Sequence, residues 1–220
     1  MPELDTHLHV DMLHSYKQEN TFVHRVRRAV KEVIFPSRFY GLQWGDPEFS
    51  GPQVFMRDKY VLPFVNPEHT ALEIGPGGGR WTRYLLGFKK LYVVDYYPEL
   101  LKELRSRFHK PNMQFIVNNG TDFPGVPDQS VDYILSVACF VHLEPHLIAG
   151  YLKNMTKVLK PGGNVFLTYS DKSKVGSQIN PTFTENGPEL MRKMLTETGF
   201  RIVDEDPTIL WNSGVVRFTF

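Results

Sequence analysis

One short stretch of the sequence combines an acidic residue with closely spaced glycines. Glu73 is followed by glycines at positions 75, 77 and 79, and Asp95 comes twenty residues after Gly75. Glycines permit a tight turn and let a ligand approach the backbone closely. A carboxylate at the end of the next strand can accept hydrogen bonds from both hydroxyls of a ribose. Together, these residue types and this spacing predict a site for a ribose-bearing cofactor.

Two common nucleotide-binding motifs do not fit this stretch. The dinucleotide fingerprint requires a further glycine where this chain has Arg80. A phosphate-binding P-loop requires Gly-Lys-Ser/Thr, and that sequence does not follow the glycines. A dinucleotide-dependent oxidoreductase is therefore disfavoured.

The elements that must position these residues follow from the hydrophobic pattern, which alternates between strand and helix from Thr70 onward. Strands are predicted at 71–74, 91–95, 114–118, 131–136, 164–169, 200–204 and 215–220, and helices at 80–86, 98–108, 144–159 and 188–198. A Pro161-Gly162-Gly163 turn is predicted before the fifth strand. This order predicts an α/β fold with a mostly parallel sheet and helices on both faces. In such sheets, ligands bind beyond the carboxyl ends of the strands.

The first 52 residues are expected to be an addition to that sheet. Valines spaced along one helical face predict a helix that ends at Pro36. Residues 39–52 are rich in glycine, proline and aromatic side chains (Phe39, Tyr40, Trp44), which indicates an irregular loop. We therefore expect a helical extension over 1–52 and a main domain over 53–220. The extension is expected to act as a lid over the strand ends; a helix packed flat on the far face is the alternative.

Five segments, in order along the chain, share one resemblance. They are Glu73-Ile74-Gly75-Pro76-Gly77-Gly78-Gly79-Arg80-Trp81-Thr82, Val93-Val94-Asp95, Asn118-Asn119-Gly120, Pro127-Asp128-Gln129-Ser130-Val131-Asp132 and Leu159-Lys160-Pro161-Gly162-Gly163. In order and spacing they resemble the motifs of class I S-adenosylmethionine-dependent methyltransferases. The resemblance implies a Rossmann-like fold of seven strands with an antiparallel last strand, and S-adenosyl-L-methionine as the cofactor.

The resemblance also implies which residues hold that cofactor. Asp95 is expected to bind the ribose, and Asn119 stands where the family usually has an Asp that contacts the adenine amino group. Arg80 is expected either to bind the methionine carboxylate or to pair on the surface. The predicted cofactor-binding set is Glu73, Gly75, Gly77, Gly79, Arg80, Thr82, Asp95, Tyr96, Asn119, Gly120, Thr121 and Ser136.

Methyl transfer to a hydroxyl requires a base near the reacting oxygen. His142, after the fourth strand, and Asp171, after the fifth, are the catalytic candidates. Each has a structural alternative, since His142 could be satisfied by a backbone group and Asp171 could cap the next segment. Gly79-Arg80-Trp81-Thr82, Phe140-Val141-His142 and Trp211 further resemble bacterial methyltransferases of sugar and natural-product biosynthesis.

Composition and net charge limit the kinds of molecule that the protein is expected to bind. The 220 residues carry a formal net charge of +1, which predicts no broad surface for nucleic acid. The longest apolar stretch, Val131 to Leu143, is too short to span a bilayer, and the N-terminus does not resemble a signal peptide. Cys139 is the only cysteine, which favours a reducing, cytoplasmic setting. His7, His9 and His14 are interpreted as solvated or lid-lining residues, so no metal site is predicted.

We therefore expect a methyltransferase that acts on a small molecule, with a sugar or natural-product hydroxyl as the first choice. Methylation of nitrogen, on a small amine or a protein, is the alternative within the same fold. Many nitrogen methylators carry an Asn/Asp-Pro-Pro-Tyr/Phe motif after the fourth strand, where this chain has Ser136-Val137-Ala138-Cys139. A non-catalytic protein that binds S-adenosylmethionine is the alternative from a different class.

Overall fold

The computed structural model describes residues 45–220, and the structural statements below refer to this part of the chain. Several sequence-based expectations lie outside the described residues. They concern the N-terminal helix, the histidines His7, His9 and His14, and the aromatic side chains of Phe39, Tyr40 and Trp44.

Seven strands form one sheet in the order β3-β2-β1-β4-β5-β7-β6. The strands are β1 (Thr70–Ile74), β2 (Lys90–Asp95), β3 (Met113–Val117), β4 (Val131–Ser136), β5 (Leu159–Ser170), β6 (Arg201–Asp206) and β7 (Ser213–Thr219). The strands from β3 to β5 pair in parallel, whereas β7 runs antiparallel to both β5 and β6. The predicted α/β, Rossmann-like fold with an antiparallel last strand is therefore confirmed.

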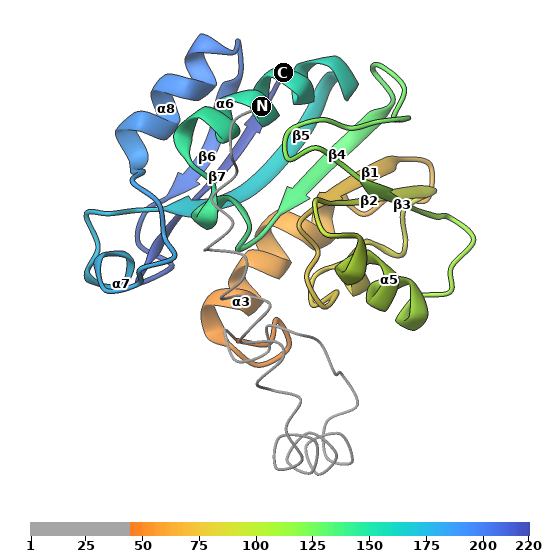
Figure 1. Cartoon of the computed structure of the whole chain (residues 1–220), viewed down its shortest axis with the longest axis horizontal. Coiled ribbons are helices and arrows are strands. Elements are labelled where there is room, and N and C mark those ends of the chain that lie inside the picture. Colours follow the sequence, from red (N-terminus) through yellow and green to blue (C-terminus); the bar gives the residue numbers. More distant parts are fainter. Residues whose placement is uncertain (1–44) are drawn as a thin grey trace. The chain divides into compact units, whose positions relative to one another are not determined.

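Helices cover both faces of the sheet, because strand side chains alternate between the faces. The helices are α3 (Gly51–Met56), α4 (Thr82–Leu85), α5 (Pro98–Arg107), α6 (Pro145–Val158), α7 (Val175–Gln178) and α8 (Pro188–Glu197), with a π-helix (Arg57–Val61) and two 3-10 segments (Leu62–Phe64 and Phe140–His142). In β1, Leu72 and Ile74 share a buried cluster with α6 and α8, while Ala71 shares the other cluster with α3, α4 and α5. Figure 1 shows these two layers on opposite sides of the sheet.

Most predicted bounds agree with the structure to within two residues, and this includes the helix after β1, although that helix is shorter than expected. It was predicted over 80–86 and spans only Thr82–Leu85. The preceding residues form the glycine turn, in which Gly77 and Gly79 have φ values of 53° and 86°. These left-handed conformations cannot belong to a right-handed helix, so the helix begins later.

The fifth strand is longer than predicted, because the Pro161-Gly162-Gly163 segment lies inside it and not before it. β5 begins at Leu159, which pairs with Val131, and the register then shifts before Asn164. Gly162 adopts a φ of 79° and its N–H donates to the carbonyl of Phe220 at 2.9 Å. The segment is therefore an irregularity within β5, and the Phe220 carbonyl accepts the hydrogen bond of its Gly162 N–H.

The helical stretch over residues 51–64 was not predicted. Its buried side chains Met56, Tyr60 and Val61 pack into the same cluster as Trp81 and Leu85. The spacing of four and one between them is helical, but the run is too short to stand out from the surrounding loop residues.

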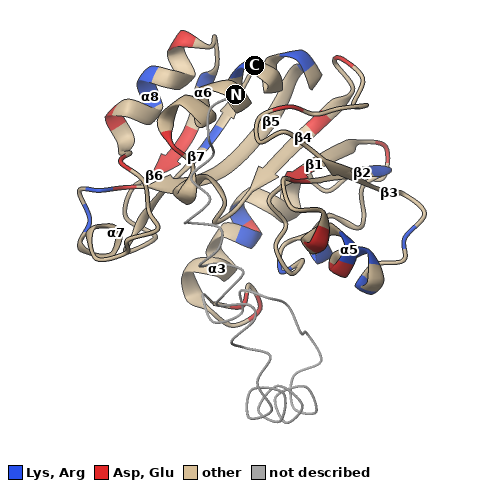
Figure 2. Cartoon of the chain, viewed as in Figure 1, with Lys and Arg blue, Asp and Glu red and all other residues tan. Residues whose placement is uncertain are grey.

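Charged residues of both signs are mixed over the described elements (Figure 2). In α5, for example, Glu99 and Glu103 alternate with Lys102, Arg105 and Arg107. Within residues 45–220, no helix is long and apolar enough to cross a membrane. The same part of the chain contains no group of three or more His, Cys, Asp or Glu side chains arranged to hold a metal ion.

Candidate functional site

The predicted site lies where β1 and β4 run side by side at the centre of the sheet. β1 connects onward to β2 on one side, while β4 connects onward to β5 on the other. The loops that follow these two strands therefore lead away in opposite directions, and ligands of open α/β sheets bind at such a point. A Cβ atom added at Gly75 would lie 2.6 Å from the Cys139 side chain, so the two loops meet directly.

Glycine is required at more than one position of the turn after β1. Gly75 has a φ of 67°, and its N–H donates to the carbonyl of Val94 at 2.9 Å. At Gly79, with a φ of 86°, a Cβ atom would lie 2.5 Å from side-chain atoms of Leu104 and Phe108 in and after α5. The turn therefore combines left-handed backbone with close packing, and both features exclude a larger side chain.

Two carboxyl groups are buried beside this turn. The Glu73 side chain is only 2% exposed, and its Oε2 accepts a 2.6 Å hydrogen bond from Thr82 Oγ1. Burial raises the pKa of Glu73 to about 8, and the nearby charge of Asp95 adds to the effect. Asp95 is 7% exposed, and its Oδ1 accepts a hydrogen bond from the N–H of Tyr97 at 2.9 Å. Burial raises the pKa of Asp95 to about 7.

The backbone after β4 is strained where it faces the turn. Ala138 has a φ of 62°, a conformation that is uncommon outside glycine, and its N–H donates to Thr168 Oγ1 at 2.8 Å. Just before it, Ser136 is fully buried and its Oγ donates to the carbonyl of Ile74 at 3.0 Å. Strained residues of this kind cluster at functional sites. Sequence reasoning singled out Ser136 but missed Ala138, because an alanine does not indicate a left-handed backbone conformation.

The loop after β3 is organised by its own side chains. Asn119 is exposed, and its Oδ1 accepts hydrogen bonds from Thr121 N at 3.1 Å and from Asp122 N at 3.2 Å. Its neighbour Asn118 is buried, and its Nδ2 donates to the hydroxyl of Tyr151 at 2.8 Å. Asn119 thus stabilises the loop in this structure, and its predicted adenine contact stays a prediction. Asn118 and Tyr151 were not predicted, although a paired Asn-Asn before glycine is a readable turn signal.

Arg80 and Tyr96 occupy different environments around the turn. Arg80 is 5% exposed and donates through Nη1 to the carbonyl of Gly45 at 2.7 Å. Burial lowers its pKa to about 10. Tyr96 is 38% exposed and packs edge-on against the ring of Tyr97, with centroids 5.1 Å apart. The structure therefore ties Arg80 to the segment that precedes α3 and puts Tyr96 on the surface beside Asp95.

On the acceptor side, His142 ends the 3-10 segment after β4. Its Nδ1 lies 2.9 Å from the carbonyl oxygen of Thr182. A carbonyl oxygen only accepts hydrogen bonds, so Nδ1 carries the proton and Nε2 keeps its lone pair in the neutral ring. Burial lowers the pKa of His142 below its usual 6.5. Near neutral pH the side chain is therefore neutral, with Nε2 able to accept a proton.

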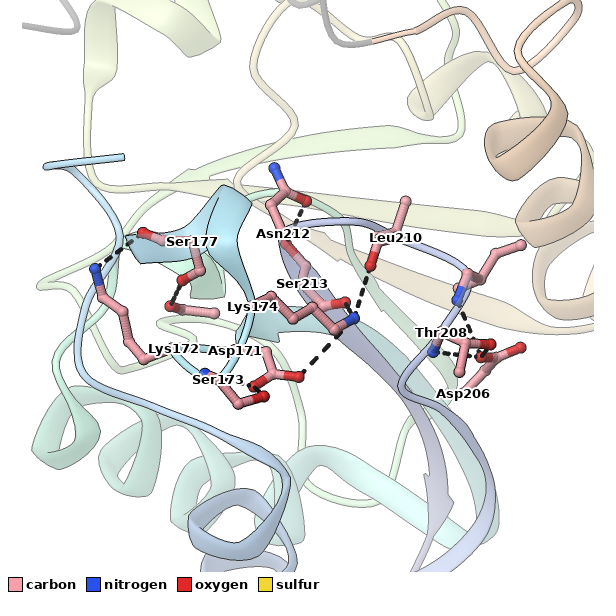
Figure 3. Close-up of polar contacts among 12 residues, drawn as sticks. Asp171, Lys172, Ser173, Lys174, Ser177, Asp206, Thr208, Leu210, Asn212 and Ser213 are labelled. Carbon is pink, nitrogen blue, oxygen red and sulfur yellow. Dashed lines mark hydrogen bonds and ion pairs between the residues drawn. The ribbon is translucent and has the colours of Figure 1, made fainter. Parts of the chain in front are cut away.

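Asp171 follows β5, but its carboxylate serves the local backbone. The side chain is 1% exposed, and Oδ1 accepts from Ser173 N at 3.1 Å and from Ser173 Oγ at 2.6 Å. Oδ2 lies 3.9 Å from Lys174 Nζ (Figure 3). Asp171 thus closes a local turn before α7, whose N-cap is Lys174, and its catalytic role stays a prediction.

The structure thus places Glu73, Thr82, Asp95, Ser136 and the glycine turn together near the carboxyl ends of β1, β2 and β4. Residues 71–163, which include all of these, match the family model described as a methyltransferase domain. This segment is a methyltransferase domain. The cofactor that such a domain implies is S-adenosyl-L-methionine.

Relatives and solved structures agree with this identification. An uncharacterised methyltransferase-like protein of Schizosaccharomyces pombe is 33% identical over 105 residues, covering 46% of this chain and 38% of its own length. A protein-L-isoaspartate O-methyltransferase of Ruegeria is 31% identical over 130 residues, covering 57% of this chain and 56% of its own length. The matches therefore span about half or less of these relatives. An S-adenosylmethionine-dependent methyltransferase of Mesorhizobium loti shares the fold, with a TM-score of 0.65 at 13% identity over 79% of this chain and 99% of that one.

The residues of the methyltransferase domain fit its cofactor on two observations. Burial disfavours the ionised forms of Glu73 and Asp95, so a cationic ligand with hydroxyl donors would stabilise these carboxylates. The turn also combines several left-handed glycines, and a backbone of this kind, without side chains of its own, lets a nucleoside approach closely.

Proposed function

We propose that this protein is an S-adenosylmethionine-dependent methyltransferase that methylates a hydroxyl of a small molecule, either a sugar or a natural product. The observation that carries the proposal is the state of His142. Its Nδ1 is held by the Thr182 carbonyl at 2.9 Å, and its buried ring stays neutral near pH 7. A neutral histidine with a free Nε2 is the base that a hydroxyl acceptor requires.

In this mechanism the chain positions two reactants and moves one proton. When bound, the cofactor supplies a methyl group on a positively charged sulfur. Asp95 would bind the ribose hydroxyls, and the backbone of the glycine turn would hold the nucleoside. His142 Nε2 accepts the proton of the acceptor hydroxyl, while the Thr182 carbonyl keeps the ring oriented and stabilises the imidazolium through Nδ1–H. General-base assistance of this kind contributes about 10²–10⁴-fold to the rate.

The experiment measures methyl transfer from S-adenosylmethionine to a panel of hydroxylated sugars and natural products by mass spectrometry of both products. His142→Asn should lose most turnover while S-adenosylhomocysteine affinity, measured by calorimetry, stays within about twofold. His146→Asn is the matched control, since His146 is an exposed histidine four residues further along. If His142→Asn turns over as fast as the wild type, the hydroxyl-acceptor proposal is wrong.

A second candidate acceptor is a protein carboxylate. The Ruegeria relative is named as a protein-L-isoaspartate O-methyltransferase. A carboxylate needs no base near neutral pH, because it is already ionised. In that case turnover would be independent of His142, so the same variant separates the two acceptors. An amine acceptor would instead show a loss of rate as the pH falls below the pKa of the amine, and a protein that only binds the cofactor would show no turnover.

The segment 1–52 is proposed as a cover over the acceptor. Its described end is held beside the glycine turn, since Arg83 pairs with Asp46 and the Tyr84 hydroxyl donates to Glu48. Deletion of residues 1–40 should preserve S-adenosylhomocysteine binding within a few-fold and abolish transfer. Full turnover of the truncated protein would exclude this role. We also propose a cytoplasmic setting, supported by a single cysteine in the whole sequence.

A further inference from the structure

Three large apolar side chains are exposed close to the acceptor side of the sheet. Val175 and Ile179, at the two ends of α7, are 69% and 67% exposed, and Trp211, in the loop between β6 and β7, is 68% exposed. We call these three residues the apolar patch. β5 ends at Ser170 and β7 begins at Ser213, and these two residues pair with each other. Both segments that carry the patch therefore leave the sheet at the edge where the glycine turn also lies.

The two segments are fastened together by a half-buried lysine. Lys174 Nζ donates to the carbonyls of Leu210 and Ser213, each at 2.6 Å, while its backbone N–H donates to the carbonyl of Asp171 at 3.0 Å (Figure 3). Hydrogen bonds from a charged donor are stronger than neutral ones, so this lysine holds the Trp211 loop against the start of α7. The apolar patch is therefore exposed to solvent, while the two segments that carry it are held together by hydrogen bonds.

Gly176 determines how the Trp211 indole sits. A Cβ atom at Gly176 would lie 2.3 Å from the indole ring, so the ring rests directly on the backbone of α7. Any other residue there would displace the indole. Trp211 therefore rests on the same short helix that begins at Val175. Because the Ile179 N–H donates to the carbonyl of Val175 at 3.0 Å, these two aliphatic residues lie one turn apart on the same side of α7.

The patch continues into the segment that orients His142. Ile179 is three residues before Thr182, whose carbonyl accepts the hydrogen bond from His142 Nδ1. Three residues of extended chain span at most about 11 Å between Cα atoms. Phe183, the next residue, packs edge-on against the His142 ring with centroids 5.4 Å apart. The end of the patch at Ile179 is therefore only a few residues from the segment that holds the His142 ring.

We propose that the apolar patch is the specificity surface for the methyl acceptor, and that the acceptor carries an apolar ring that packs on Trp211 while its hydroxyl reaches His142. This inference rests on the proposed function and narrows its substrate class to ring-bearing, mostly apolar natural products. The polar side chains around α7 are already engaged, since Lys172 Nζ donates to the Ser177 carbonyl and Ser177 Oγ pairs with Ser170 Oγ. A sugar, with hydroxyls over its whole surface, would find little to bind here.

The test uses the full-length chain saturated with S-adenosylhomocysteine and titrated with 2-naphthol, a hydroxylated apolar ring, by ligand-detected NMR. Methyl β-D-glucopyranoside is the polar comparison. Trp211→Ala and the double change Val175→Ser with Ile179→Ser should each weaken 2-naphthol binding about fivefold or more. Phe220→Ala is the matched control, because Phe220 is an exposed aromatic (46%) at the opposite end of the antiparallel strand pair, and it should change binding by less than twofold.

The outcomes separate this inference from the function on which it rests. S-adenosylhomocysteine affinity should stay within twofold in all variants; if the wild type does not bind it, the proposed function itself fails. If the wild type binds S-adenosylhomocysteine but not 2-naphthol, or if both patch variants bind 2-naphthol like the wild type, the inference is overturned and the proposed function survives. Trp211-dependent binding of the glucoside alone, or a dimer that the patch variants convert to a monomer in light scattering, would also overturn it.

Discussion

The buried carboxyl of Asp95 makes cofactor binding depend on pH in a predictable direction. Burial raises its pKa to about 7 in the free protein. Ribose hydroxyls donate hydrogen bonds, so they favour the ionised form of the carboxyl. S-adenosylhomocysteine should therefore bind more tightly as the pH rises toward 7 and should reach constant affinity above about pH 8.

The size of the effect follows from the fraction of Asp95 that is ionised. At pH 5.5, about 1.5 units below a pKa of about 7, roughly 3% of the molecules carry the carboxylate. If only the ionised form binds well, the dissociation constant at pH 5.5 should be about thirtyfold higher than at pH 8, which corresponds to about 2 kcal/mol. The amino and carboxyl groups of the ligand keep their charges over this range, so the slope belongs to the protein.

Asp95→Asn provides the decisive comparison. At pH 8 the variant should lose a charge-assisted acceptor, which is worth about 1.5–3 kcal/mol, or about 10- to 150-fold in affinity. At pH 5.5 the variant and the wild type should bind almost equally, because the wild-type carboxyl is then mostly protonated. Calorimetry at four pH values between 5.5 and 8.5 measures both curves. Parallel curves for the two proteins, or a flat wild-type curve, would refute the assignment of the ribose to Asp95.

Three further expectations follow from the same site. Glu73→Gln should raise the free energy of unfolding at pH 9 by at most about 5 kcal/mol, and should not raise it at pH 4. The native carboxyl has a pKa of about 8, so the wild type loses stability as the pH rises from about 4.5 to 8. Urea titrations measure the difference, and equal stability of the two proteins at pH 9 would contradict this. Gly79→Ala should lower the free energy of unfolding by about 1–3 kcal/mol, since its Cβ would lie 2.5 Å from packed side chains at a left-handed φ, and thermal unfolding measures the loss. With saturating S-adenosylmethionine, the turnover of the wild type should fall with pH only below about 6.5, because burial lowers the pKa of His142 and the base works in its neutral form. A saturated rate that falls between pH 8 and 7 would point to another group.

The parts of the site that could be predicted from sequence are those that depend only on residues close together in the chain. A glycine turn between a strand and a helix is visible in seven consecutive letters, and Asp95 follows at the end of the next apolar run. The mostly parallel sheet with helices on both faces followed from the same alternation of strands and helices. These features need no knowledge of any distant residue, so the pattern alone predicted them.

The parts that were missed depend on partners far away in the chain. The irregularity at Gly162 is satisfied by Phe220, and Arg80 donates to Gly45, 35 residues earlier. Lys174 holds carbonyls that lie 36 and 39 residues further on. Sequence periodicity reports which side of an element is apolar, but it does not report which distant backbone group a long polar side chain reaches.

The position of β7 has a consequence for how the chain acquires its structure during synthesis. β7 lies between β5 and β6, so the edge strand β6 has no neighbour in the sheet until residues 213–219 have left the ribosome. Until then β5 presents an open, apolar edge, of the kind that pairs with other chains. A nascent chain arrested near residue 210 would therefore carry the complete cofactor turn and yet be prone to aggregate and to be degraded. Insertion of β7 between β5 and β6, more than formation of the glycine turn, is therefore the step that closes the open edge of this sheet.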